Sequence, residues 1–288
     1  METVKLNNGV EMPMEGFGVF QVDDLAVCEQ AVADAISVGY RLFDTASVYK
    51  NEAAVGAAIR KSGLSRSDFF VTSKAWIAEM GYEKTKGAFE KTLKNLGMDY
   101  LDLYLIHQPF SDYYGAWRAM KELYKEGRIR AIGVSNFTSD RIIDLCYNTE
   151  IIPAVNQIEL HPFYQRTEEL DILKEYGIQP QAWAPFAEGM NGMFTNPVLS
   201  QVAAAHNKSV AQVVLRWNLE RGISVIPKSV RKNRMEENWT VWDFKLSADE
   251  VERIAQLDLN RPQMLDTRNV NEVRRVYGFE ENPVITSL

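Results

Sequence analysis

The chain has 288 residues, of which 46% are hydrophobic and 25% are charged, and its formal net charge is -7. These proportions are ordinary for a globular protein, and the acidic balance disfavours the broad basic face that nucleic acid binding needs. No apolar run approaches the ~18 residues that span a bilayer and the N-terminus lacks the pattern of a signal peptide, so we expect a cytoplasmic protein.

The predicted elements begin with a β-hairpin. Residues 4–6 and 10–12 flank Asn7, Asn8 and Gly9, which tolerate the positive φ of a tight turn. After the hairpin, short apolar segments alternate with amphipathic helices. The predicted strands are residues 17–20, 41–44, 69–73, 101–106, 129–134, 154–158, 179–183 and 223–226.

Helical spacing fills the gaps between these strands. Leu25, Cys28, Val32 and Ile36, for example, recur at three- and four-residue steps. Most strand-to-strand intervals are roughly 25 to 30 residues, the length of a βα repeat, and the last has room for two helices. The chain after Asn260 lacks clear periodicity, and we expect it to pack as a loop over one end.

Eight such units predict a closed (β/α)8 TIM barrel with an N-terminal β-hairpin. A doubly wound open sheet is the alternative. It is disfavoured because Gly16 and Gly18 begin the pattern Gly-x-Gly-x-x-Gly but the third glycine is missing. Since no linker rich in Pro, Gly or Ser divides the chain, we expect a single domain over residues 1–288.

Four titratable side chains follow three neighbouring strands. Asp44 and Tyr49 follow the second strand, Lys74 the third and His107 the fourth. The active site of a (β/α)8 barrel lies at the carboxyl ends of its strands, so these side chains should converge on one mouth. Each alone is explained by a structural role, as a helix cap, a packed aromatic ring, a solvated lysine or a core histidine. Only their co-occurrence indicates catalysis.

Together these four residues suit the reduction of a carbonyl group. A neighbouring ammonium group at Lys74 should lower the pKa of the Tyr49 phenol. Asp44 would hold the lysine charged, and His107 would orient the incoming oxygen. Such a set protonates an oxyanion as it forms, which is what hydride delivery to a carbonyl requires.

The chain resembles the aldo-keto reductase family along essentially its whole length. The matching motifs are Met12-Pro13-x-x-Gly16-Phe17-Gly18, Phe43-Asp44-Thr45-Ala46-x-x-Tyr49-x-Asn51-Glu52, Leu101-Asp102-Leu103-Tyr104-Leu105-Ile106-His107, Gly133-Val134-Ser135-Asn136-Phe137, Asn156-Gln157-x-Glu159-x-His161-Pro162 and Ile226-Pro227-Lys228-Ser229. The bacterial branch that reduces diketogluconate, glyoxals and other small dicarbonyls is the one it resembles. The resemblance implies NADPH-dependent reduction of aldehydes and ketones, with catalytic roles for Asp44, Tyr49, Lys74 and His107.

The resemblance also implies a site for the nicotinamide. Ser135, Asn136 and Gln157 would hold its carboxamide, and Trp183 would stack on its ring. A primary amide needs both donors and acceptors, which these side chains supply. Asn136 equally suits a turn or a helix cap, and Trp183 equally suits a core aromatic at a strand end.

A basic cluster follows the eighth strand. It consists of Lys228, Ser229 and Arg234, with Arg231 and Lys232 between them. Two cations and a hydroxyl suit a phosphate monoester such as that on the ribose of NADPH, and the resemblance implies that Glu237 and Asn238 contact the adenine or its ribose. A solvated charge run on a helix is the plain alternative.

Two positions depart from the family pattern. Ala184 stands where the family often has serine, and Glu188 falls in the loop that approaches the pyrophosphate. An acidic side chain does not bind phosphate directly. We therefore expect Glu188 either to act as a clasp or to point away from the cofactor.

Phe20, Val48, Trp76 and Phe110 match the substrate-pocket positions of the family. An apolar rim discriminates weakly among aldehydes, because apolar contacts differ by only ~1–3 kcal/mol between close substrates. Packing alone explains each aromatic equally well. We expect the tail, residues 261–288, to form part of the pocket wall.

The sequence is also compatible with two other functions. An NADPH-binding redox-sensing or regulatory module would keep the same residues, as channel-associated relatives of the family do. A Schiff-base aldolase using Lys74 would leave the basic cluster without a role. No cluster of His and Cys has metal-ligand spacing, so we expect no metal, and we expect the chain to act as a monomer.

Overall fold

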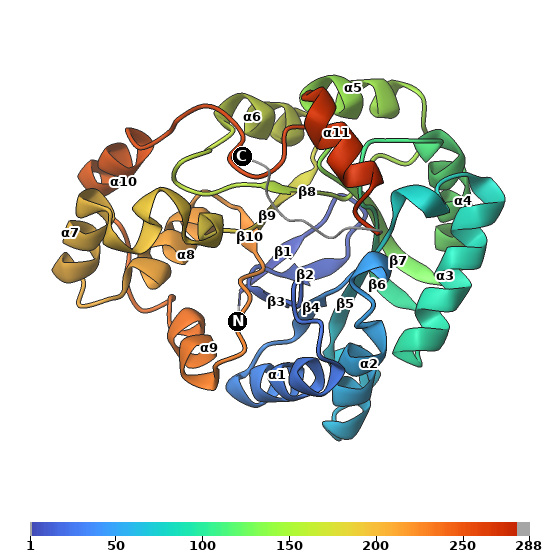
Figure 1. Cartoon of the computed structure of the whole chain (residues 1–288), viewed down its shortest axis with the longest axis horizontal. Helices are drawn as coiled ribbons and strands as arrows, with labels where there is room; N and C mark the ends of the chain where they lie inside the picture. Colours follow the sequence, from blue (N-terminus) through green and yellow to red (C-terminus); the bar gives the residue numbers. More distant parts are fainter. Residues whose placement is uncertain (1, 281–288) are drawn as a thin grey trace.

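Eight parallel strands form the centre of the computed structural model, which describes residues 2–280 (Figure 1). The strands follow one another around the sheet in chain order. They are β3 (Gly16–Gly18), β4 (Leu42–Asp44), β5 (Phe70–Ala75), β6 (Leu101–Ile106), β7 (Ile129–Ser135), β8 (Val155–Glu159), β9 (Gln179–Trp183) and β10 (Ser224–Val225). Each predicted strand is present, with ends that differ by at most two residues.

The first and last strands of the sheet meet and nearly close the barrel. An isolated parallel bridge joins Glu15 to Val225, and the backbone N–H of Gly18 donates to the carbonyl of Pro227 at 3.1 Å. A Cβ at Gly18 would lie 2.9 Å from the carbonyl oxygen of Ile226, so only glycine permits this approach. A doubly wound sheet would reverse its strand order instead. The predicted (β/α)8 TIM barrel is therefore confirmed.

The predicted N-terminal hairpin is also present. Strands β1 (Thr3–Lys5) and β2 (Glu11–Pro13) pair antiparallel. Between them, the Asn7 side chain donates to the carbonyl of Pro153 at 2.9 Å and that of Asn8 to the carbonyl of Arg130 at 2.9 Å. Both carbonyls lie at the amino ends of barrel strands, so the hairpin covers the end of the barrel opposite the predicted site.

Helices surround the strands (Figure 1). They are α1 (Leu25–Val38), α2 (Glu52–Lys61), α3 (Tyr82–Leu96), α4 (Tyr113–Lys125), α5 (Ser139–Tyr147), α6 (Thr167–Glu175), α7 (Pro197–Ala205), α8 (Val210–Glu220), α9 (Lys232–Trp239), α10 (Ala248–Ala255) and α11 (Val270–Tyr277), with short 3-10 turns η1 (Ser47–Tyr49), η2 (Arg66–Asp68), η3 (Ile77–Glu79) and η4 (Ala187–Thr195). The interval between β9 and β10 holds two helices, as predicted. Within residues 2–280, none of the helices combines the length and the apolar character of a transmembrane span.

Both faces of the barrel strands are buried, which explains their continuous apolar runs. In β6, Leu103 and Leu105 join the interior cluster with Met12 of the hairpin, whereas Tyr104 and Ile106 join the larger cluster against the helices. The interior is thus filled with apolar side chains from the amino end. Polar side chains remain at the carboxyl ends of the strands, where the pocket opens.

The expectation that the tail packs only as a loop is wrong, because it contains α11. The Asn269 side chain caps this helix by accepting the N–H of Asn271. Glu272 and Arg275 form an ion pair along it at 2.6 Å. Eight residues are too few to display a convincing helical period in the sequence. The part of the predicted pocket wall at residues 281–288 lies outside the described residues.

Candidate active site

A cavity of about 430 Å³ opens at the carboxyl ends of the barrel strands. Side chains or backbone from five strands line it. These are Gly18 of β3, Asp44 of β4, Ser135 of β7, Gln157 of β8 and Trp183 of β9. The cavity therefore lies where the polar residues that follow the strands were predicted to converge.

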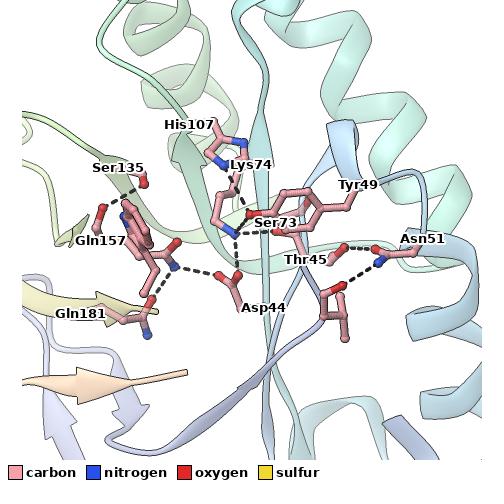
Figure 2. Close-up of polar contacts among 12 residues, drawn as sticks. Asp44, Thr45, Tyr49, Asn51, Ser73, Lys74, His107, Ser135, Gln157 and Gln181 are labelled. Atoms are coloured by element: carbon pink, nitrogen blue, oxygen red, sulfur yellow. Dashed lines mark hydrogen bonds and ion pairs between the residues drawn. The ribbon is translucent and has the colours of Figure 1, made fainter. Parts of the chain in front are cut away.

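Lys74 lies at the centre of the four predicted catalytic residues (Figure 2). Its Nζ is fully buried and donates to Asp44 Oδ1 at 2.5 Å and to the carbonyl of Thr45 at 2.9 Å. The same Nζ lies 3.5 Å from the hydroxyl oxygen of Tyr49, and His107 Nε2 lies 3.4 Å from that oxygen. The structure thus brings all four side chains together.

Burial dominates the acidity of the phenol. It raises the pKa of Tyr49 well above the ordinary value of 10, and the negative charge of Asp44 raises this pKa further. The prediction that the pKa of Tyr49 is lowered overall is therefore wrong, because burial and Asp44 together raise it. Desolvation outweighs the neighbouring ammonium group, and the hydroxyl keeps its proton at neutral pH.

Burial also shifts the pKa values of Lys74 and His107. Burial lowers the pKa of Lys74, while the charge of Asp44 and its hydrogen bond to Lys74 oppose this effect. Burial and the charge of Lys74 lower the pKa of His107 well below 6.5. His107 is therefore a neutral imidazole at neutral pH, with Nε2 towards the phenol.

Asn51 fixes the loop that carries Tyr49. The buried Asn51 side chain donates to the carbonyls of Val19 at 2.9 Å and Val22 at 3.3 Å, and it accepts the hydroxyl of Thr45 at 2.7 Å. The loop after β3 is thereby tied to the loop after β4. In the sequence, Asn51 stood out only as part of a matched motif, because the carbonyls of Val19 and Val22 lie about thirty residues away and no local pattern connects them.

Asn136 is held at the end of β7 by three hydrogen bonds. It adopts a left-handed φ of 62°, and its Nδ2 donates to the carbonyl of His107 at 3.0 Å and to Ser135 Oγ at 3.1 Å. Trp183 Nε1 donates to Asn136 Oδ1 at 2.8 Å. The amide and the indole ring predicted for the nicotinamide site therefore form one wall of the cavity.

Gln157 connects this wall to the buried ion pair. Its Nε2 donates to Asp44 Oδ2 and to Gln181 Oε1, each at 2.8 Å (Figure 2). Asp44 therefore accepts from Lys74 on one oxygen and from Gln157 on the other. Gln181 was not among the predicted site residues. It lies on β9, the strand next to the one that carries Gln157.

The residues present fit a nicotinamide. A hydroxyl, two side-chain amides and an indole ring line the cavity beside Tyr49, which is the donor and acceptor set that a flat ring with a primary amide requires. Gln108 lines the same cavity, and its buried Oε1 has no hydrogen-bond partner in residues 2–280.

The basic cluster begins at one end of the cavity. Lys228 lines the cavity and is exposed. Four further predicted cofactor residues lie beyond the cavity lining, on the following loop and on α9. They are Ser229, Arg234, Glu237 and Asn238. Lys228 and Arg234 are both exposed, so each cation is accessible to a phosphate group.

Glu188 bridges to the opposite loop and does not point away. Its Oε1 accepts a hydrogen bond from Gln21 Nε2 at 3.1 Å, and both residues line the cavity. Burial raises the pKa of Glu188, while the hydrogen bond from Gln21 and the charge of Lys228 lower it. Of the two alternatives for Glu188, the geometry is that of a clasp.

Aromatic and aliphatic side chains form the other end of the cavity. Phe20, Val48 and Trp76 line it, whereas Phe110 packs behind them, with its ring 5.9 Å from that of Tyr277. The tail adds lining residues that the sequence did not single out. They are Met264, Leu265, Arg275, Val276 and Phe279.

Comparison with known proteins gives consistent matches. Residues 20–259 match the model of the Aldo/keto reductase family. The glyoxal reductase of Bacillus subtilis is 50% identical over 258 residues, which cover 89% of this chain and 93% of that protein. The methylglyoxal reductase DkgA of Escherichia coli O157:H7 is 42% identical over 258 residues, covering 88% and 93%. The crystal structure of a Bombyx mori aldo-keto reductase in complex with NADP has a TM-score of 0.86 at 34% identity, covering 91% and 94%.

Proposed function

The chain belongs to the aldo/keto reductase family, and we propose that Tyr49 is the proton donor in its NADPH-dependent reduction of carbonyl compounds. The observation that carries this proposal is the 3.5 Å distance between Lys74 Nζ and the Tyr49 hydroxyl at the cavity. The two groups are close enough for the ammonium to stabilise the phenolate that proton donation leaves behind.

The proposed roles of the four residues follow from their contacts. Bound NADPH supplies the hydride that the carbonyl carbon accepts. Tyr49 donates its proton to the carbonyl oxygen as negative charge develops there, and Lys74 stabilises the resulting phenolate. Asp44 keeps the Lys74 amine charged and oriented. The neutral His107 orients the substrate oxygen by hydrogen bonding.

We propose roles for the remaining site residues from the chemistry of the side chains at each end of the cavity. Ser135, Asn136 and Gln157 hold the carboxamide, and Trp183 stacks on the ring. The residues that hold the 2′-phosphate, the ribose and the adenine are Lys228, Ser229, Arg234, Glu237 and Asn238. The apolar end, which takes the substrate, is formed by Phe20, Val48 and Trp76, and Phe110 supports it by packing behind them.

Small dicarbonyls and aldehydes are the substrates that we propose. Two relatives of this chain are named for glyoxal and methylglyoxal. The cavity of about 430 Å³ must accommodate the nicotinamide as well as the substrate, which favours small carbonyl compounds. Larger keto-sugars would extend past the apolar rim towards solvent.

A substrate panel tests the proposal. Oxidation of NADPH is followed at 340 nm with methylglyoxal, simple aldehydes, aldoses and diketogluconate, and methylglyoxal should give the highest kcat/KM. Tight NADPH binding without turnover of any of these carbonyls would instead support the redox-sensing module. Trapping of substrate on Lys74 by borohydride in the absence of nucleotide would support the aldolase.

We also propose that residues 1–288 form a single-domain cytoplasmic monomer that binds no nucleic acid. Cys28 and Cys146 are free thiols, which is usual in a reducing compartment. The net charge of -7 opposes the binding of a polyanion. Light scattering should give a mass near 32.8 kDa, and a mass of twice that value would contradict the monomer.

A further inference from the structure

Glu159 is a buried carboxylate that the catalytic set does not use. It ends β8 and is 1% exposed. Its Oε1 accepts the backbone N–H groups of Gln263 at 2.8 Å and Met264 at 3.2 Å, and its Oε2 accepts those of Leu265 at 3.2 Å and Met264 at 3.4 Å. One side chain thus binds three successive amides of the segment between α10 and α11.

This contact satisfies the buried charge of Glu159. A buried carboxylate is costly unless several donors surround it, and hydrogen bonds to an ionised acceptor are stronger than neutral ones. His161 is a fourth partner of Glu159, since its Nε2 lies 3.2 Å from Glu159 Oε1 and its side chain is fully buried. The barrel wall therefore holds residues 263–265 firmly at its carboxyl end.

The segment that Glu159 holds is part of the cavity wall. Met264 and Leu265 line the cavity, and Leu265 packs in the apolar cluster that contains Val48 and Trp76. Glu159 itself does not line the cavity. Glu159 therefore acts on the substrate end of the cavity only indirectly, through the backbone of residues 263–265.

The segment also contacts α11. Arg275 Nη2 donates to the carbonyl of Met264 at 3.3 Å and pairs with Glu272 at 2.6 Å. Val276 and Phe279, at the end of α11, line the cavity. The N–H of Met264 is thus bound to the barrel, and its carbonyl is bound to the helix that completes the pocket.

We infer that Glu159 is a positioning residue for the carbonyl substrate, because it fixes the tail segment 263–265 and thereby the wall of the substrate pocket. The inference rests on the proposed function, since it takes the apolar end of the cavity as the place where the carbonyl compound binds. Loss of the anchor should weaken substrate binding equally in the ground and transition states. That loss raises KM and leaves kcat unchanged.

The test is the variant Glu159→Gln, which replaces one acceptor oxygen by an NH2 group of nearly the same size. The contacts of that oxygen are lost, because two donors then face each other. We expect KM for methylglyoxal to rise about tenfold, with kcat and the Kd for NADPH within about twofold of the unmodified protein. Glu159→Asp keeps both oxygens and should recover part of the loss.

Glu250→Gln is the matched control. Glu250 also pairs with a histidine, His206, at 3.0 Å and accepts the backbone N–H of Ser247 at 2.7 Å. It lies on α10 and does not line the cavity. Removing its charge should leave KM unchanged, which separates the loss of the tail anchor from the loss of a Glu–His pair elsewhere on the protein.

Hydrogen exchange supplies a readout that does not depend on activity. Amides 263–265 should exchange faster in Glu159→Gln than in the unmodified protein, while those of the barrel strands keep their protection. Unchanged exchange at these amides, an unchanged KM, or a kcat that falls in step with the rise in KM would each overturn the inference. If the glutamine variant does not fold, Glu159→Asp carries the test with smaller shifts in the same direction. Failure of the proposed function would be visible separately, as absent turnover in the unmodified protein.

Discussion

The Nζ of Lys74 lies 3.5 Å from the hydroxyl oxygen of Tyr49, and Asp44 holds the same amine from the other side. Because burial raises the pKa of Tyr49, the phenol is protonated in the resting protein. The buried ammonium is already in position to stabilise the phenolate. Proton donation is therefore favoured only when negative charge develops on a substrate oxygen within reach of Tyr49.

The first prediction concerns Tyr49→Phe, which removes the proton donor and keeps the ring. We expect kcat to fall by about 10²-fold or more. The Kd for NADPH, measured by quenching of tryptophan fluorescence, should stay unchanged because the residues proposed for the dinucleotide lie on other strands. Tyr147→Phe is the control, since Tyr147 is 81% exposed. Near-normal turnover in Tyr49→Phe would remove Tyr49 from its role.

The second prediction concerns Lys74→Met, which removes the ammonium from the buried pair. Turnover should fall about as far as in Tyr49→Phe, because nothing then stabilises the phenolate. Asp44 would also be left buried without its cation, which costs about 3–5 kcal/mol of the free energy of unfolding. Adding Asp44→Asn should recover much of that stability, measured by urea denaturation, and none of the turnover. A double variant as unstable as Lys74→Met would argue against the ion pair as the cause.

The third prediction concerns the choice of dinucleotide. If Lys228 and Arg234 bind the 2′-phosphate, NADPH should bind well over tenfold tighter than NADH, since charge-assisted hydrogen bonds to a phosphate are strong. Lys228→Ala and Arg234→Ala should each weaken NADPH binding and leave NADH binding unchanged. Lys94→Ala, at an exposed position on α3, should affect neither. Equal dissociation constants for NADPH and NADH would refute the assignment.

The barrel and the catalytic four were accessible from the sequence for a simple physical reason. A (β/α)8 barrel repeats one local unit, so the period of the apolar residues reports the strands directly. Residues that follow successive strands share one end of the barrel. Asp44, Lys74 and His107 could therefore be placed together without any contact being known.

What the sequence did not reveal depends on contacts between distant parts of the chain. Glu159 and Gln263 are separated by 104 residues, and no local pattern relates them. The direction of the Tyr49 pKa shift depends on how completely the surrounding side chains exclude water. The short helix α11 is stabilised by its Asn269 cap and by packing over the cavity. Its eight residues are too few for an apolar period in the sequence to predict it.

The last prediction concerns Glu15, a fully buried carboxyl group where the barrel closes. Tyr40 donates to Glu15 Oε1 at 3.1 Å. Burial raises the pKa of Glu15 to about 8, and the hydrogen bond from Tyr40 offsets only part of that shift. In the unfolded chain the ordinary value is 4.5. Between these two values the unfolded chain loses the proton while the folded protein keeps it.

Raising the pH from 4.5 towards 8 should therefore destabilise the folded protein through Glu15, by up to about 1.4 kcal/mol per pH unit. The variant Glu15→Gln resembles the protonated acid at every pH, so its free energy of unfolding should lack this decline. Urea denaturation at pH 5, 6, 7 and 8 should show the two proteins nearly equal at pH 5 and the variant increasingly the more stable towards pH 8. Above pH 8 both states have lost the proton, and the difference should become constant. Parallel pH profiles from 5 to 8 would mean that Glu15 is already ionised in the folded barrel.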